Sequence, residues 1–209
     1  MEDRQQVIER LLAAHEAWFD VERDHEFAGR TFPGYAEFHS TATKYVLVKR
    51  AKLWEASAHE YLFFCETPHL DAVTLNELVS FMTSEALAKV QLGPDHMSSY
   101  LSLVVVADTV DTAASRQVRA TRFRKNFSFG FRGWADLRLA VIDLSQGRVH
   151  TNGQGKALKE TLATNAFVCA VSPEQERGRA AGETASGDGP SHGTGDLATE
   201  PHAARVSSE

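Results

Sequence analysis

Basic side chains gather in one short segment of the second half of the chain. If residues 112–124 form a helix, Arg116, Arg119 and Arg122 share a face, because they are three positions apart. Further basic residues and a tryptophan follow within the next turn and strand. Such an arrangement attracts a small anionic ligand or the acidic surface of a partner protein. We therefore expect a ligand-binding or partner-binding site formed by Arg119, Arg122, Lys125, Arg132 and Trp134.

The charge of the chain is unevenly distributed. Residues 1–95 carry nine basic and 16 acidic side chains, whereas residues 96–171 carry ten basic and five acidic ones. An anion would therefore be drawn to the second half. We expect instead that acids of the first half, such as Asp20 and Glu22, fold over the basic segment and neutralise its charge. The net charge of −6 argues against nonspecific binding of nucleic acid.

Phenylalanines alternate with small or polar residues beside this basic segment. Phe127, Phe129 and Phe131 recur at every second position. Alternation of this kind is typical of a strand with one buried face, so we expect the three rings to lie in the core. The alternative is an exposed stacking platform for bases next to the arginines.

Other motifs that carry chemistry are incomplete. His59 begins a zinc-binding HExxH pattern, but Phe63 occupies the position of the second histidine. Residues 153–156 (GQGK) resemble a phosphate-binding loop, yet His150 and Ala157 stand where that loop requires glycine and Ser or Thr. We therefore expect a turn leading into a helix at this point, no metal site and no cofactor.

Hydrophobic periodicity predicts the elements that must position these residues. Apolar positions three and four apart predict helices around residues 7–19, 75–86, 112–124 and 156–167. Alternating or β-branched runs predict strands around residues 35–41, 44–55, 59–65, 100–106, 127–132, 136–142 and 148–151. Thr74 and Glu77 fit a capping box at the start of the second helix. Without the short strand at residues 148–151, the resulting order is α-β-β-β-α-β-α-β-β-α, which predicts an α+β domain with a mixed, mostly antiparallel sheet.

The first part of this order, αβββαβ, is also the core order of restriction-endonuclease-like nucleases. Those enzymes hold a divalent cation with an acid on the second strand and an acid-x-lysine motif on the third. This chain has no such lysine after its strand acids. An enzyme that acts on nucleic acid or another phosphate-containing substrate remains the alternative hypothesis. It would use Glu55, Glu60 or Asp108 as cation ligands and Lys125 as charge support.

Composition divides the chain into a folded part and a tail. Residues 172–209 contain no aromatic side chain and hold six of the 14 glycines, so they cannot bury enough apolar surface to offset the entropy lost on ordering. We expect one domain over residues 1–171 and a disordered acidic tail over residues 172–209. No apolar run approaches the roughly 18 residues of a membrane helix, and residues 1–6 do not resemble a secretory signal. A cytoplasmic protein without a membrane partner is expected.

Three segments of the sequence carry a resemblance. They are residues 44–55, the turn at residues 96–100 and the run RKNFSFGFRGW at residues 124–134. Together they resemble an uncharacterised family of small single-domain proteins from anaerobic bacteria, over about residues 5–165. The resemblance implies a single-domain cytosolic bacterial protein and no known activity. The function we expect from the residues is therefore a non-enzymatic domain that binds a protein partner or a small anionic ligand.

Overall fold

The computed structural model of the chain describes residues 3–46, 51–93 and 96–167. The predicted tail at residues 172–209 lies outside this range. The longer elements are α1 (Arg4–His15), β1 (Asp20–Phe27), β2 (Arg30–Val46), β3 (Ala51–Leu70), α2 (Ala72–Thr83), β4 (His96–Val110), α3 (Thr112–Ala120), β5 (Arg124–Asn126), β6 (Trp134–Asp143), β7 (Arg148–Thr151) and α4 (Lys159–Ala166). Short 3-10 helices are η1 (Ala86–Lys89), η2 (Ser128–Gly130) and η3 (Gln154–Leu158).

The seven strands of the described residues form one mixed sheet in the order β1-β2-β3-β4-β6-β5, and β7 also pairs with β6. The β3–β4 and β4–β6 pairs are parallel, and the other four pairs are antiparallel. Parallel neighbours need a crossover connection, which α2 and α3 supply. The predicted α+β domain with a mostly antiparallel sheet is confirmed, with one more strand after α3 than the predicted order contains.

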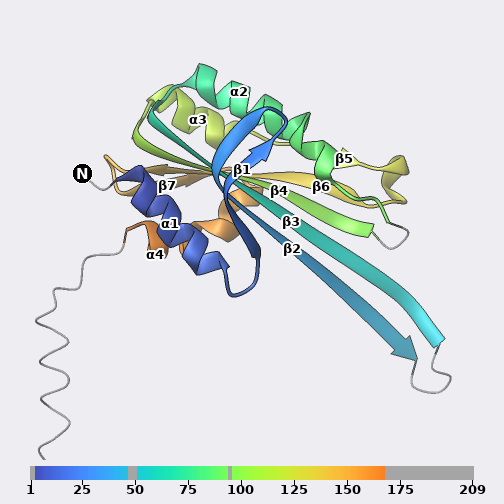
Figure 1. The fold of residues 1–209 in the computed structure, drawn as a ribbon. Helices are drawn as coiled ribbons and strands as arrows, with labels where there is room; N and C mark the ends of the chain where they lie inside the picture. The colour runs from blue at the N-terminus through green and yellow to red at the C-terminus, as the bar shows by residue number, and fades with distance from the viewer. Residues whose placement is uncertain (1–2, 47–50, 94–95, 168–209) are drawn as a thin grey trace, which may run out of the picture. The chain divides into compact units, whose positions relative to one another are not determined.

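Helices cover both faces of the sheet, α2 and α3 on one face and α1 and α4 on the other (Figure 1). Alternate side chains of the central strands supply the two cores. Phe63 and Leu103 belong to the cluster that contains residues of α2 and α3, whereas Phe64 and Val104 belong to the cluster of α1 and α4. Burying each such side chain stabilises the fold by about 1.5–3 kcal/mol. Apolar residues on both faces explain why the central strands read as continuous hydrophobic runs.

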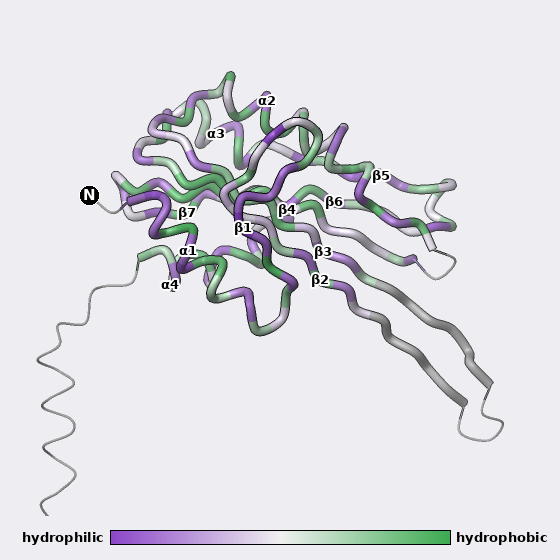
Figure 2. The backbone as a smooth tube through the Cα atoms, viewed as in Figure 1, coloured by the Kyte–Doolittle hydropathy of each residue, from purple (hydrophilic) through white to green (hydrophobic). Residues whose placement is uncertain are grey.

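The β1–β2–β3 meander differs from the prediction in its boundaries. Strand β1 was not predicted, because its sequence DVERDHEF is mostly polar, as its colour in Figure 2 shows. It lies at the edge of the sheet, where charged side chains are common. The single strand predicted at residues 44–55 is the end of β2 and the start of β3, so that prediction is wrong.

Two helix ends also differ from the prediction. The Asp71 carboxylate accepts a hydrogen bond from the Thr74 backbone N–H and caps α2, so the predicted capping box at Thr74 is wrong. Helix α1 ends at His15. Trp18, which the periodicity assigned to the buried face of this helix, lies beyond its end and is exposed.

Candidate functional site

The structure divides the five predicted site residues between two places. Arg119, near the end of α3, lines a cleft with residues of β7 and α4. Lys125, Arg132 and Trp134 lie in the hairpin that joins β5 to β6. Arg122 is exposed in the link between α3 and β5 and does not line the cleft. The predicted helix ends four residues early, at Ala120, which is why the basic residues do not share one helical face.

The cleft has a volume of about 590 Å³, within the range that small-molecule sites occupy. Its lining combines cations with an apolar wall. The cationic side chains are Arg119, Arg148, Lys156 and Lys159, joined by His150. Val149, Ala163 and Phe167 supply the apolar part. Because four chain segments contribute to it, the cleft exists only in the folded domain.

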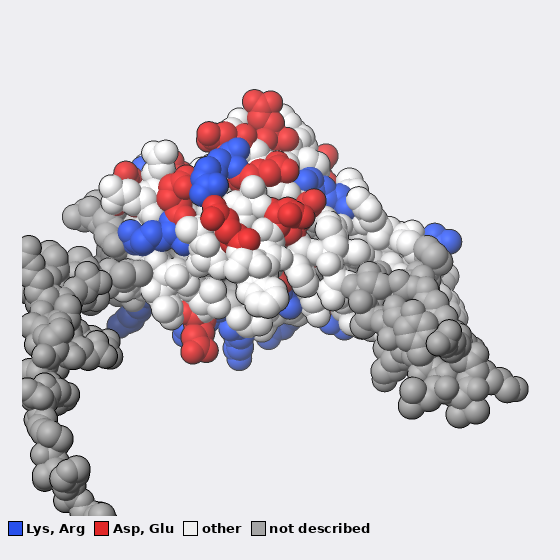
Figure 3. Space-filling model, turned by 60° about the horizontal axis from the view of Figure 1, so that its bottom comes forward, with Lys and Arg blue, Asp and Glu red and all other residues white. Residues whose placement is uncertain are grey.

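The four permanent cations of the cleft form no ion pair with any described residue. Acids of the first half pair elsewhere: Glu9 and Glu16, for example, hold Arg23. Figure 3 shows acidic and basic side chains interspersed on one face of the molecule. In the predicted basic segment, Arg124 pairs with Asp136 of the second half, and Arg116, Arg119, Arg122, Lys125 and Arg132 form no ion pair with a described acid. The expectation that acids of the first half neutralise this segment is therefore wrong over the described residues.

His150 is the titratable group of the cleft. Its Nε2 lies 3.9 Å from a carboxylate oxygen of the buried Asp143. Burial lowers the pKa of His150, and Arg119, Arg148 and Lys159 lower it further, while Asp143 acts in the opposite direction. The lowered pKa favours neutral His150 near pH 7, and a bound anion would favour its protonated form.

Asn152 holds the segments of the cleft together. Its Oδ1 accepts hydrogen bonds from the backbone N–H of Leu139 (3.0 Å) and Gly155 (2.7 Å). Its Nδ2 donates to the backbone C=O of Leu137 (2.9 Å) and Thr121 (3.4 Å). These bonds tie the end of α3, strand β6 and η3 to one buried side chain. The predicted turn into a helix at residues 153–156 is confirmed, and this turn places Lys156 in the cleft.

Three of the four cations of the cleft, Arg148, Lys156 and Lys159, are not among the site residues predicted from the sequence. The charge excess of residues 96–171 includes them, but their separation along the chain hides their proximity. Lys156 was considered only as part of an incomplete phosphate loop. The hydrogen bonds of Asn152 bring these segments together, and a turn signal such as Asn-Gly does not reveal those bonds.

The hairpin between β5 and β6 contradicts the prediction that its phenylalanines are buried. Phe129 and Phe131 are fully exposed, at 101% and 92% of their maximal surface. The strand predicted over residues 127–132 is a loop instead, because Ser128, Phe129 and Gly130 all have positive φ. Such φ values turn the chain away from an extended strand. Only Phe127 is partly covered, by the ring of His96 at 6.0 Å.

The base of this hairpin is fixed to the start of β4. The Phe127 N–H donates to the Gly133 C=O, and the Arg132 N–H donates to the Phe127 C=O. His96 Nδ1 lies 2.7 Å from the Arg132 carbonyl oxygen. Gly133 has φ +75° and lies so close to β4 that a Cβ on it would be 2.2 Å from the Met97 carbonyl oxygen. The loop therefore projects from a rigid base.

The residues proposed for a cation-dependent enzyme do not meet. Glu60 accepts hydrogen bonds from Ser102 and Arg138, both at 2.8 Å. Asp108 pairs with Arg4 and lies eight residues beyond the β4 partner of Glu60, about 26 Å away along the strand. Lys125 is on β5, three strands from β3 and about 14 Å away. Glu55 is on β3, and its side chain lies outside the described part.

Cysteine and histidine chemistry is equally limited in the described ranges. Cys65 is a free, buried thiol, and burial raises its pKa to about 12. A thiol with this pKa stays protonated at pH 7 and is a poor nucleophile. Within the same residues, no group of three or more His, Cys, Asp or Glu side chains is arranged to hold a metal ion. Cys169 lies outside the described residues.

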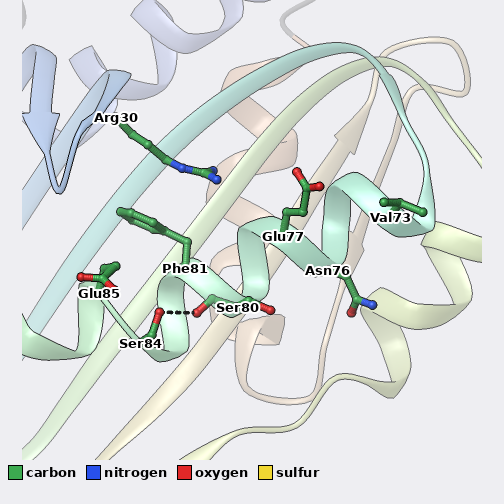
Figure 4. A pocket seen from close by; sticks show the side chains of 8 residues that line it. All are labelled: Arg30, Val73, Asn76, Glu77, Ser80, Phe81, Ser84 and Glu85. Carbon is green, nitrogen blue, oxygen red and sulfur yellow. Dashed lines mark hydrogen bonds between the residues drawn. The ribbon is translucent and has the colours of Figure 1, made fainter.

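A second cavity of about 560 Å³ lies along α2. Figure 4 shows Arg30 reaching from the start of β2 toward this helix, with Glu77 and Glu85 among the other lining residues. The Arg30 guanidinium lies 5.0 Å from the centre of the Phe81 ring. One cation opposed by two carboxylates makes this cavity less suitable for an anion than the cleft beside β7.

Comparison with curated proteins and with solved structures finds no match. Among the described helices, none has both the length and the apolar character needed to cross a membrane. The pattern of one protein family, described as a domain of unknown function (DUF8052), matches residues 3–164. That match includes α1, the whole sheet, Arg119, the β5–β6 hairpin and most of the cleft. The chain therefore belongs to the DUF8052 family.

Proposed function

We propose that this domain is a non-catalytic binding module that holds a small phosphate-bearing anion in the cleft formed by α3, β7, η3 and α4. The observation that carries the proposal is the set of four cations around one cleft, none of which has an ion-pair partner in the described chain. We further propose, as the sequence resemblance implies, that it acts in the cytoplasm of anaerobic bacteria.

The electrostatics of the cleft support this function. Like charges that gather around one cavity repel one another, and this repulsion destabilises the folded state. A bound anion removes the repulsion, and a ligand that binds only the folded state raises its stability. Guanidinium groups such as those of Arg119 and Arg148 suit phosphate oxygens, because they can donate two parallel hydrogen bonds. Phe167 and Val149 in the lining can contact an apolar part of the ligand.

Charge reversal tests the cleft directly. We expect the full chain to bind inorganic pyrophosphate, measured by isothermal titration calorimetry at low ionic strength. Arg148→Glu should weaken this binding about tenfold or more, because it replaces an attraction by a repulsion inside the cleft. Arg116→Glu is the matched control, since Arg116 is exposed on α3 and does not line the cleft. Equal effects of the two variants, or no binding by the unmodified chain, would contradict the proposal.

The affinity for an anion should also depend on pH through His150. Sulfate is a suitable probe, because its charge is constant over the pH range tested. The lowered pKa means that His150 gains its charge only below its ordinary range, so sulfate should bind about three- to tenfold more tightly near pH 5.5 than near pH 7.5. His150→Gln should abolish most of this dependence. A variant that keeps the full dependence would show that another group is responsible.

A further inference from the structure

The β5–β6 hairpin carries a second surface that the anion cleft does not use. Phe129 and Phe131 stand at its apex, and both rings are fully exposed. Exposing two large apolar side chains on one short loop is unfavourable in water, so this loop marks a contact surface. Met97, which is 44% exposed, lies beside the base of the hairpin and extends the apolar surface.

Charges and aromatic rings are ordered along this hairpin. The apex at residues 128–131 is uncharged and contains both exposed rings. Arg132 follows the apex, and Lys125 and Arg124 lie below it on β5, paired with Ala135 and Asp136. Lys125 and Arg132 form no ion pair with a described residue, whereas Arg124 pairs with Asp136. The hairpin thus presents an apolar end first and cations behind it.

Trp134, the first residue of β6, lies at the base of the β5–β6 hairpin. The guanidinium of Arg124 lies 5.3 Å from the centre of its ring. Its indole Nε1 is buried and has no hydrogen-bond partner among the described residues. Trp134 therefore belongs to the partly buried support of the hairpin and is not part of its exposed apolar end.

We propose that the β5–β6 hairpin docks the domain on an anionic lipid bilayer, with Phe129 and Phe131 inserted among the acyl chains and Lys125 and Arg132 at the headgroups. The order of apolar apex and cationic base matches the order of acyl chain and anionic headgroup across a membrane surface. The expectation of no membrane partner rests on the lack of a predicted membrane-spanning run, and a peripheral contact of this kind needs no such segment. This inference is independent of the anion cleft, which uses other side chains.

Single-stranded nucleic acid fits the hairpin less well. Exposed aromatic rings can stack on bases, which is the alternative to burial that the alternating phenylalanines left open. Binding to a strand also requires a charged groove that follows the phosphates. Here the two rings occupy the apex of a short loop, and only Lys125 and Arg132 beside them are cations without an ion pair to a described residue, so no charged groove continues from the rings.

Vesicle sedimentation tests the proposal with the full chain. We expect the protein to sediment with vesicles that contain about 30% phosphatidylserine in phosphatidylcholine, and much less with pure phosphatidylcholine. The double variant Phe129→Ala/Phe131→Ala should bind the anionic vesicles about tenfold more weakly or worse. Its fold should be intact, because neither ring packs in the core. Trp18→Ala is the matched control, since Trp18 is an exposed aromatic residue in a different part of the domain.

Raising the salt concentration and reversing the charge of Lys125 test the electrostatic part of the contact separately from the apolar part. Raising NaCl from about 0.05 M to about 0.3 M should release the protein, and Lys125→Glu should weaken binding at low salt. The proposal is overturned if anionic vesicles do not bind, or if the double phenylalanine variant binds as well as Trp18→Ala. Binding of a dT12 oligonucleotide without vesicle binding would also overturn it and would assign the hairpin to nucleic acid.

Discussion

Asn152→Ala should lower the free energy of unfolding by about 3–5 kcal/mol, because one side chain satisfies four backbone groups. Strand β5 pairs with β6 only at residues 134–136, and β7 pairs with it at residues 140–143. Asn152 fills the gap between these two edge strands by bonding to Leu137 and Leu139. Alanine would leave their buried polar groups without partners. Urea denaturation of the unmodified chain and of the Asn152→Ala variant measures the difference in the free energy of unfolding.

The control for this variant is Asn165→Ala. The amide of Asn165 donates only to the Thr161 C=O within α4, in an exposed position. Its removal should cost about 0.5 kcal/mol or less. If the two alanine variants unfold at the same urea concentration, Asn152 does not hold the cleft together as the hydrogen bonds indicate.

Gly133→Ala should be nearly as disruptive, with a loss of about 3 kcal/mol or more. Two effects add at this position. The φ of +75° strains any residue with a Cβ, which costs about 1–2 kcal/mol. The new methyl group would also lie 2.2 Å from the Met97 carbonyl oxygen, a backbone atom, so β4 and the base of the hairpin must move apart.

Gly130→Ala separates these two effects. Gly130 has φ +93°, but nothing lies within 4 Å of a Cβ built on it. Gly130→Ala should lower the free energy of unfolding by about 1–2 kcal/mol, because it adds backbone strain and no steric clash. Thermal or urea unfolding of the two variants gives the comparison. Equal losses would mean that the close approach of Gly133 to β4 has no energetic consequence.

Much of the fold could be predicted from hydrophobic patterns. The β-branched run at residues 100–106 predicted β4, and the turn signals around residues 148–151 predicted β7. The patterns failed where an element has little apolar surface. Strand β1 is polar because it lies at the sheet edge, and its position there depends on pairing with β2, which local sequence does not encode.

The candidate site was only partly predictable. The charge excess of the second half indicated the part of the chain from which the cations of the cleft come, and Arg119 is the one residue of the predicted set of five that lines this cleft. Arg122 does not, because α3 ends at Ala120. Arg148 and Lys159 join Arg119 only through the packing of β7 and α4 beside α3. Proximity between residues some 30–40 positions apart is a property of the fold, so helical spacing could not reveal it.

The sequence by itself determined the α+β class, the two-faced apolar strands of the central sheet and the excess of cations after residue 95. These features depend on composition and on short-range periodicity, which act through local backbone geometry. The tertiary structure alone decided which cations share a cleft and whether Phe129 and Phe131 are buried. Phenylalanines at every second position are compatible with a strand and also with this loop, so the alternation does not distinguish the two. Only the positive φ values of residues 128–130 and the contact of Gly133 with β4 turn the rings outward, into solvent.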